Sequence, residues 1–334
     1  MPKIFSHAIS GMPTRFLAAL AISLAFVVFL TVDQAHWWQS KPDYQFGWLV
    51  PVFIVYILVE RWPRLKAIFH AGGSSPLSGW LRGLISVAAG AALGLGLTFF
   101  IFGAVYRAGA GASQPGSFAL ATGFSGILLG MIYFNVPNGR IGNGPTPGGW
   151  AAISSDGRLR ATSLFIFPAF IWILSAPLVT AVENSVSLFL LRKVVTVVFT
   201  LFGLLGFPIV REGNVLVLPH GNVGVAEACS GIRSLTACLF AGSFLAAVNL
   251  DRFWKKVLLV VSALLLAFVT NLLRSIFLTA WAYAYGSDAI EGTLHDATGF
   301  AVLGLTCLGL FGLLPLFRSE NWNKWLGADP GRSR

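Results

Sequence analysis

Charged side chains are scarce in this chain. Of its 334 residues only 11% are Asp, Glu, Lys or Arg, whereas 56% are hydrophobic. An ordinary soluble domain carries about 25% charged residues, so a soluble globular protein is excluded. Apolar runs recur along the whole chain, and about 20 such residues are what an α-helix needs to cross a bilayer. The composition therefore predicts an all-α polytopic membrane protein.

Cysteine is scarce as well. The three cysteines are Cys229, Cys238 and Cys307, and no two of them form a CxxC pair. This spacing argues against a disulfide framework and against a metal site, so we expect neither a metal nor another cofactor. Cys238 and Cys307 lie inside apolar segments, where a free thiol usually packs as a small hydrophobic group.

Eight apolar segments are the predicted transmembrane helices, and residues 1–334 are expected to form a single integral membrane domain. The predicted spans are residues 16–32, 46–59, 83–103, 118–134, 161–181, 230–250, 257–283 and 299–317.

Residues 184–207 decide the topology, because they are apolar but carry Arg192 and Lys193 in the middle. Cytoplasmic loops are enriched in Lys and Arg. With eight spans and an inner N-terminus, the basic loop 251–256 and the C-terminal tail lie inside. With nine spans both move outside and the asymmetry disappears. We therefore predict that residues 184–207 form an amphipathic helix that lies in the membrane interface. The protein as a whole is expected to lie in the cell (inner) membrane.

The net charge of +10 would suggest nucleic acid as a partner of a soluble protein. Here the positive side chains concentrate on the predicted inner face, where anionic lipid accounts for them. Membrane lipid is therefore an expected partner, and nucleic acid is not.

Two loops differ from the rest. Residues 135–160 are rich in Gly, Pro and Asn, which predicts a flexible cytoplasmic loop. Residues 208–226 contain a Glu-Gly-Asn turn followed by apolar β-forming residues, which predicts a short extracytoplasmic β-hairpin.

A polar cluster lies at the outer end of the predicted span 230–250. It contains Glu227, Cys229, Ser230 and Arg233. Cys229 and Arg233 are four residues apart and share a face of a helix, and a nearby cation stabilises a thiolate. Ionisable groups at a membrane boundary are costly, so this cluster is a candidate functional site with Cys229 as its nucleophile.

Two further polar groups follow. Arg274 lies in the outer half of the span 257–283, with Asn271 three residues earlier, and His295 with Asp296 lies in the next outer loop. Arg274 could instead brace neighbouring helices or reach outward to the interface, and His295 and Asp296 also fit simple capping of a helix. The outer placement of Cys229, Arg274 and His295 nevertheless predicts cysteine chemistry on the extracytoplasmic side.

The alternative function is a transporter in which Arg274 and the outer acidic residues form a solute site. Such proteins often contain paired half-helices or inverted repeats, and the sequence shows neither. A serine-dependent membrane enzyme is a second rival, but the polar groups here surround a cysteine.

Three blocks of residues resemble the exosortase/archaeosortase family of membrane transpeptidases. They are Glu227–Leu235, Asn271–Arg274 and His295–Gly299, in the order and spacing of that family. The segments 211–219 and 47–51 are similar to further family elements, so the resemblance covers most of residues 43–315. Gln45-Phe46 stands where the family usually has Ser-His, and any role of that histidine is absent here.

The resemblance implies a role for each block. Cys229 would be the nucleophile and His295 the general acid/base, while Arg274 would steady the oxyanion or the thiolate. The substrates would be exported proteins that end in a short motif, a transmembrane helix and a basic tail. Cleavage beside the motif would form a thioester and pass the protein to an acceptor, for which a lipid-linked or polysaccharide-linked group is a candidate.

Overall fold

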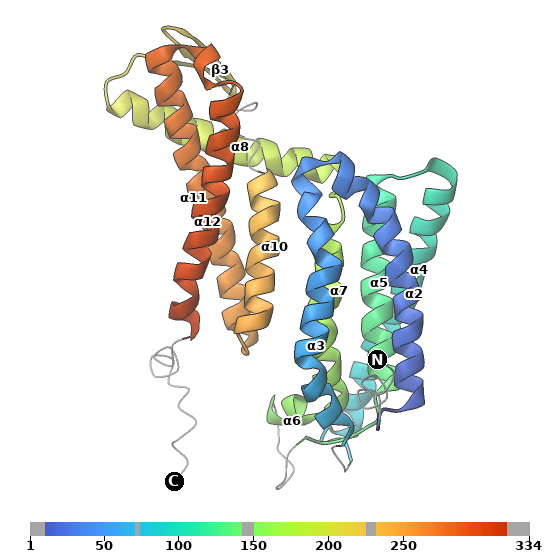
Figure 1. Cartoon of the computed structure of the whole chain (residues 1–334). Helices are drawn as coiled ribbons and strands as arrows, with labels where there is room; N and C mark the ends of the chain where they lie inside the picture. Colours follow the sequence, from blue (N-terminus) through green and yellow to red (C-terminus); the bar gives the residue numbers. More distant parts are fainter. Residues whose placement is uncertain (1–10, 71–73, 142–149, 225–231, 319–334) are drawn as a thin grey trace, which may run out of the picture. The chain divides into compact units, whose positions relative to one another are not determined.

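The computed structural model describes residues 11–70, 74–141, 150–224 and 232–318. In these ranges the chain is almost entirely helical and adds one small antiparallel sheet (Figure 1). This confirms the predicted all-α polytopic fold class. The contacts divide the chain into two compact units, Met1–Val179 and Thr180–Arg334.

Eight helices in the described ranges are long and apolar enough to cross a membrane. The count matches the predicted eight, but the sets differ, since α8 is included and α10 (Ile232–Asn249) is not. The interfacial placement of residues 184–207 therefore stays a prediction. The eight are α2 (Thr14–Ser40), η1 with α3 (Pro42–Phe69), α4 (Gly79–Ala110), α5 (Gln114–Asn135), α7 (Gly157–Ser175), α8 (Thr180–Leu204), α11 (Phe253–Tyr285) and α12 (Thr293–Arg318).

Most helices extend beyond the predicted spans at both ends. α11 has 33 residues, which makes it about 50 Å long at 1.5 Å per residue. The hydrocarbon core is only ~30 Å thick, so hydropathy marked the apolar middle of this helix and missed its ends. The predicted span 46–59 also differs in kind at its start, because Pro42–Leu49 form the 3-10 helix η1 before α3 (Val50–Phe69) begins.

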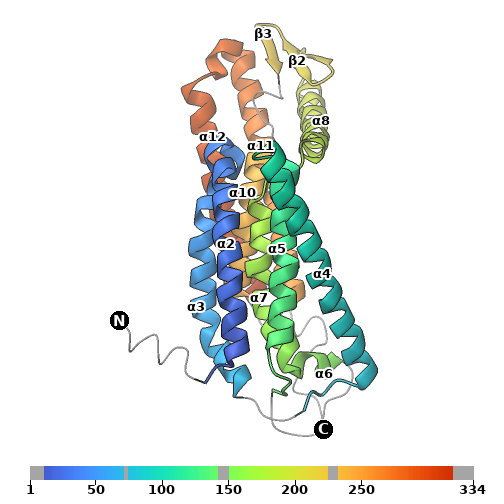
Figure 2. The ribbon, with the colours of Figure 1, turned by 90° about the vertical axis from the view of Figure 1, so that its right-hand side faces the viewer.

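α5 is the most buried helix of the first unit, and it contacts α2, α4 and α7. α4 lies along α5 as its neighbour in the views of Figures 1 and 2. A Cβ added to Gly123 would lie 2.5 Å from the backbone nitrogen of Phe100, and one added to Gly96 would lie 2.7 Å from that of Ile127. The two backbones therefore touch directly, as small residues permit between membrane helices.

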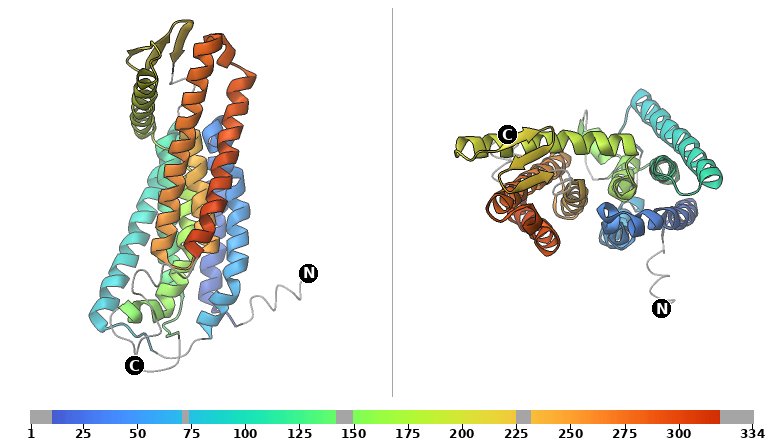
Figure 3. Two further views of the ribbon diagram at one scale, coloured as in Figure 1. Left: turned by 90° about the vertical axis from the view of Figure 1, so that its left-hand side faces the viewer. Right: turned by 90° about the horizontal axis from the view of Figure 1, so that it is seen from above.

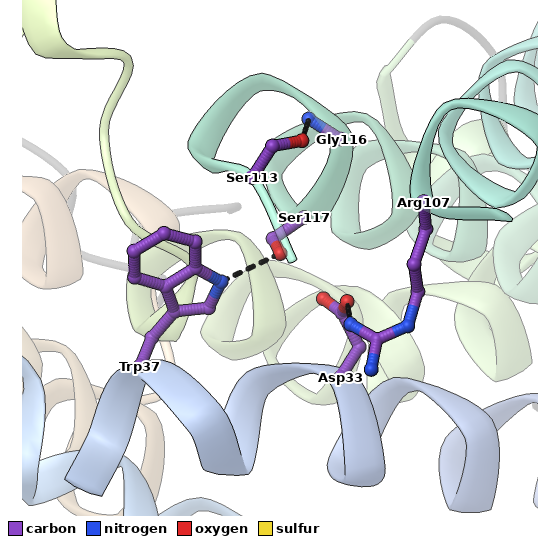
Figure 4. A network of polar contacts seen from close by, with 6 residues as sticks. All are labelled: Asp33, Trp37, Arg107, Ser113, Gly116 and Ser117. Carbon is purple, nitrogen blue, oxygen red and sulfur yellow. Dashed lines mark hydrogen bonds and ion pairs between the residues drawn. The ribbon is translucent and has the colours of Figure 1, made fainter. Parts of the chain in front are cut away.

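A polar network joins α2, α4 and the start of α5 (Figure 4). Arg107 of α4 forms an ion pair with Asp33 of α2, and Asp33 is buried. Trp37 Nε1 of α2 donates to Ser117 Oγ of α5 at 2.7 Å. Ser113 accepts from the backbone N–H of Gly116, which caps α5. Arg107 and Ser117 thus pair with Asp33 and Trp37 in an apolar surrounding, where unpaired polar groups are costly. The second carboxylate oxygen of Asp33, Oδ2, is buried without a hydrogen-bond partner among the described residues.

In the second unit, α10, α11 and α12 pack together. Their shared core consists of Ala246, Leu250, Leu259, Ala263, Leu310, Leu314 and Phe317. α8 runs crosswise to α11 and α12 in Figures 1 and 3. One face of α8 carries Leu191, Val194 and Val198, which pack on Leu278 of α11, whereas Arg192 and Lys193 are exposed.

The predicted hairpin in residues 208–226 is a three-stranded sheet. β1 (Val210–Glu212), β2 (Val215–Leu218) and β3 (Gly221–Gly224) follow one another in antiparallel order. The predicted hairpin corresponds to β1 and β2, and β3 adds a third strand that the prediction did not include. Leu216 and Val223 face each other across β2 and β3, and both are buried in the core with α8 and α11.

The prediction of a flexible loop over 135–160 is corrected at its ends. The short helix α6 (Trp150–Ser155) is followed at once by α7, and Arg140 forms a β-bridge with Asp156. Asp156 also caps α7 by accepting from the N–H of Leu159 at 3.0 Å. The centre of the predicted loop, residues 142–149, lies outside the described residues.

The direct α4–α5 contact predicts a sharp cost for one methyl group. Gly123→Ala should destabilise the protein by about 1–3 kcal/mol, as overpacking of a core does. Gly94→Ala on α4 is the control, because a Cβ there meets nothing within 4 Å. Thermal unfolding in detergent measures both variants. Equal midpoints for the two would contradict this packing.

Candidate functional site

Arg274 of α11 binds the first turn of α12. Its Nη2 donates to the backbone carbonyl of His295 at 3.0 Å, and its Nε donates to Thr298 Oγ1 at 3.2 Å. Both acceptors lie in the second unit with Arg274. A charged group in an apolar helix needs such partners, because desolvation without them costs several kcal/mol. The structure thus brings together two of the three residues predicted to be catalytic.

The turn between α11 and α12 makes this contact possible. α11 ends before Gly286, which has a φ of +92°, and Gly292 precedes α12 with a φ of +65°. Between them the 3-10 helix η2 (Ser287–Ile290) buries Ile290 in the core that contains Leu278 and Ala282 of α11. Glycine adopts these left-handed conformations without strain. The reversal returns the start of α12 to the flank of α11.

His295 is half-buried in the first turn of α12, before the predicted span 299–317. Burial lowers its pKa from the ordinary value, and the positive charges of Arg274 and Arg233 act in the same direction, while Asp296 raises it. The imidazole is therefore held neutral near pH 7, as a proton acceptor must be. Among the described residues neither ring nitrogen of His295 has a hydrogen-bond partner, and the contacts of this residue are made by its backbone carbonyl.

The supporting residues occupy different places. Arg233 is exposed in the first turn of α10, and its charge reaches His295. Asn271 is buried one turn before Arg274, and its backbone carbonyl accepts from Ser275 Oγ at 3.0 Å. Asp296 is exposed beside His295. Arg233 and Asp296 therefore act on the imidazole through charge, whereas Asn271 belongs to the buried face of α11.

The rest of the predicted cluster, Glu227, Cys229 and Ser230, lies outside the described residues. The role of Cys229 as the nucleophile therefore stays a prediction. The other two cysteines are free thiols in helices, with Cys238 buried in α10 and Cys307 half-buried in α12. In the parts of the chain that the structure describes, no group of three His, Cys, Asp or Glu side chains could hold a metal ion.

Thr298 is the site residue that the sequence analysis missed. It lies in the His295–Gly299 block, and its hydroxyl also donates to the carbonyl of His295 at 2.9 Å. The available signal was the spacing, because a Thr three residues after a helical residue can bond its carbonyl. The contact with Arg274 joins two helices and carried no signal in the sequence.

Comparison with known proteins gives one finding. The family model described as "Transmembrane exosortase" matches residues 37–312, which include Arg233, Arg274 and His295. No curated protein and no solved structure matches significantly.

The charges around His295 predict opposite shifts for two substitutions. Arg274→Gln removes a nearby positive charge, so the pKa of His295 should rise toward its ordinary value. Asp296→Asn removes the negative charge that raises this pKa, so the pKa should fall further. The pH dependence of diethyl pyrocarbonate modification, followed by mass spectrometry of the His295 peptide, measures both. Shifts of the same sign would contradict this electrostatic account.

Proposed function

Because the chain belongs to the transmembrane exosortase family, we propose that it is a membrane cysteine transpeptidase or protease that cleaves the C-terminal sorting signal of exported proteins. The observation that carries the proposal is the contact of the Arg274 guanidinium with the His295 carbonyl, 3.0 Å long, within the matched region. A cation and an acid/base group are thereby joined on two neighbouring helices, and Cys229 supplies the proposed nucleophile.

The first half of the reaction is acylation. The neutral imidazole of His295 takes the proton of Cys229, and the resulting thiolate attacks the carbonyl carbon of the scissile peptide bond. The oxyanion that forms accepts hydrogen bonds from Arg274, which are strong in a partly dry site. Collapse of this intermediate breaks the C–N bond, and the imidazolium gives its proton to the leaving amine. The exported protein remains as a thioester on Cys229.

The second half transfers the protein. An acceptor nucleophile loses its proton to His295, attacks the thioester and releases the Cys229 thiolate. We propose a lipid-linked or polysaccharide-linked acceptor, with water as the alternative that would make the reaction hydrolysis. The low pKa of His295 serves both halves, because a weakly basic imidazole readily returns the proton that it takes.

The proposed substrate carries a short motif, one transmembrane helix and a basic tail. Its scissile bond would lie just outside its own helix on the extracytoplasmic side. Arg274 suits such a bond, because it lies seven residues before Trp281 of α11, or roughly 10 Å at 1.5 Å per residue, and tryptophan is typical of the membrane–water interface. A site at this shallow depth can receive a peptide bond that emerges from the bilayer.

The placement of α8 in the outer interface belongs to the same proposal. Its crosswise course relative to α11 and α12 and its exposed Arg192 and Lys193 support an interfacial helix. In this position α8 would keep residues 208–226 and the start of α10 on the same side of the bilayer as His295.

Loss of the proposed nucleophile should abolish processing. When the chain is co-expressed with a tail-bearing substrate, Cys229→Ala should lower cleavage by at least about a thousandfold, as removal of a catalytic nucleophile does. Cys238→Ala is the control, since this buried thiol lies in the helix packing of α10. Gel mobility of the substrate reports cleavage. Normal processing of the substrate by the Cys229→Ala variant would refute the assignment of Cys229 as the nucleophile.

Two reporter fusions test the topology. Fusions after residue 222 and after residue 251 should report outside and inside, respectively, if α8 lies in the interface and α10 crosses. If α8 crosses and α10 does not, both fusions report inside. If both helices cross, the first reports inside and the second outside. Paired alkaline phosphatase and green fluorescent protein fusions give these readings, and only the first pattern agrees with the proposal.

A further inference from the structure

We propose that Thr298 is a positioning residue, which fixes the orientation of the Arg274 guanidinium and the location of His295. This inference rests on the proposed function. Three hydrogen bonds form a closed ring around Thr298. Arg274 Nε donates to Thr298 Oγ1, Thr298 Oγ1 donates to the His295 carbonyl, and Arg274 Nη2 donates to the same carbonyl.

The ring uses both capacities of the Thr298 hydroxyl. A Thr in a helix often bonds a carbonyl of the preceding turn, which by itself is only a local feature. Here the same oxygen also accepts from a charged donor on another helix at 3.2 Å. Hydrogen bonds in series strengthen one another, and those from an ionised donor are the stronger kind. The hydroxyl therefore couples the first turn of α12 to a residue of α11.

The geometry of guanidinium explains why two acceptors matter. Nε and Nη2 lie along one edge of the planar group and form a fork with two parallel N–H bonds. Nε donates to Thr298 and Nη2 donates to the His295 carbonyl, so the two hydrogen bonds together hold the plane of the guanidinium in one orientation. Of the five N–H groups of Arg274, the described residues occupy two, so the opposite end of the guanidinium presents the others. This end is the part that can meet a developing oxyanion.

Without the Thr298 hydroxyl, the Nε–H of Arg274 would lose its acceptor. Arg274 could still bind the His295 carbonyl through Nη2, but it could rotate about that single bond. Donors that stabilise a transition state must be held close to the productive geometry. A loss of orientation should therefore lower kcat and leave KM nearly unchanged, since the ground-state substrate does not depend on the oxyanion contact.

Three substitutions test this role. Thr298→Val keeps the shape and removes the hydroxyl, whereas Thr298→Ser keeps the hydroxyl. The matched control is Thr306→Val, which breaks the 2.9 Å contact between Thr306 Oγ1 of α12 and Thr270 Oγ1 of α11. This control removes a buried hydroxyl pair between the same two helices, two turns further along α12.

The first measurement is the rate of substrate cleavage by purified enzyme. Thr298→Val should lower kcat roughly tenfold, with KM within about twofold of wild type. Thr298→Ser should retain more than about half of kcat, and Thr306→Val should match wild type. A wild-type kcat for Thr298→Val would overturn the proposal. An equal loss in Thr306→Val would overturn it too, because general helix pairing would then explain the effect.

The second measurement does not need the proposed reaction. In Thr298→Val the guanidinium of Arg274 rotates about its one remaining hydrogen bond and is no longer fixed in orientation beside His295. The average effect of its positive charge weakens, so the pKa of His295 should rise, while Thr298→Ser and Thr306→Val leave it unchanged. Diethyl pyrocarbonate modification of the His295 peptide across pH reports this shift. An unshifted titration in Thr298→Val overturns the positioning role. Processing by Cys229→Ala would instead overturn the proposed function, and the titration would still decide the role of Thr298.

Discussion

A guanidinium in an apolar helix needs fixed partners, and the second unit is organised around that need. Arg274 cannot be solvated by hydrocarbon, so its N–H groups bind the carbonyl of His295 and the hydroxyl of Thr298. These acceptors are available only if the chain reverses within a few residues after α11. The glycines at 286 and 292 allow that reversal, and the buried Ile290 anchors it. The hydrogen bonds that Arg274 requires thus hold the first turn of α12 against α11.

The first unit meets the same requirement in another way. Asp33 is buried, and Arg107 from α4 neutralises it, while Trp37 and Ser117 satisfy each other nearby (Figure 4). Packing around these groups is close because glycines let α4 and α5 touch through their backbones. Lipid offers no hydrophobic drive for helices to associate, so contact of this kind and polar pairs carry the association. Both units therefore join apolar helices through a few polar side chains that pair across the helices.

Much of the fold could be predicted from composition and hydropathy. The apolar runs gave eight candidate helices because burial in lipid demands length and apolarity, both of which are local properties. Most predicted spans were too short at both ends, since a helix such as α11 continues past its apolar middle in both directions. The strand β3 was missed because its stability comes from Val223 packing against α8 and α11, a contact between distant segments. The glycine contacts of α4 and α5 also depend on a partner helix.

The candidate site could be predicted where a single residue is unusual in its sequence context, such as a charged side chain in an apolar segment. Arg274 stood out because an intramembrane cation is expensive, and His295 stood out through its place in a motif. Thr298 had no such signal, since a hydroxyl three residues after a histidine is common and its importance depends on the facing helix. The hydrogen-bond partners of Arg274 on α12 were therefore found only in the structure.

The central claim is that Cys229 forms an acyl-enzyme beside Arg274 and His295. The most direct measurement is mass spectrometry of the wild-type protein, quenched in acid during turnover of a tail-bearing substrate without an acceptor. The account predicts that the N-terminal part of the substrate is attached to the peptide containing Cys229 through a bond that neutral hydroxylamine cleaves. Turnover with no adduct on Cys229, or an adduct on Cys238 or Cys307, would contradict it.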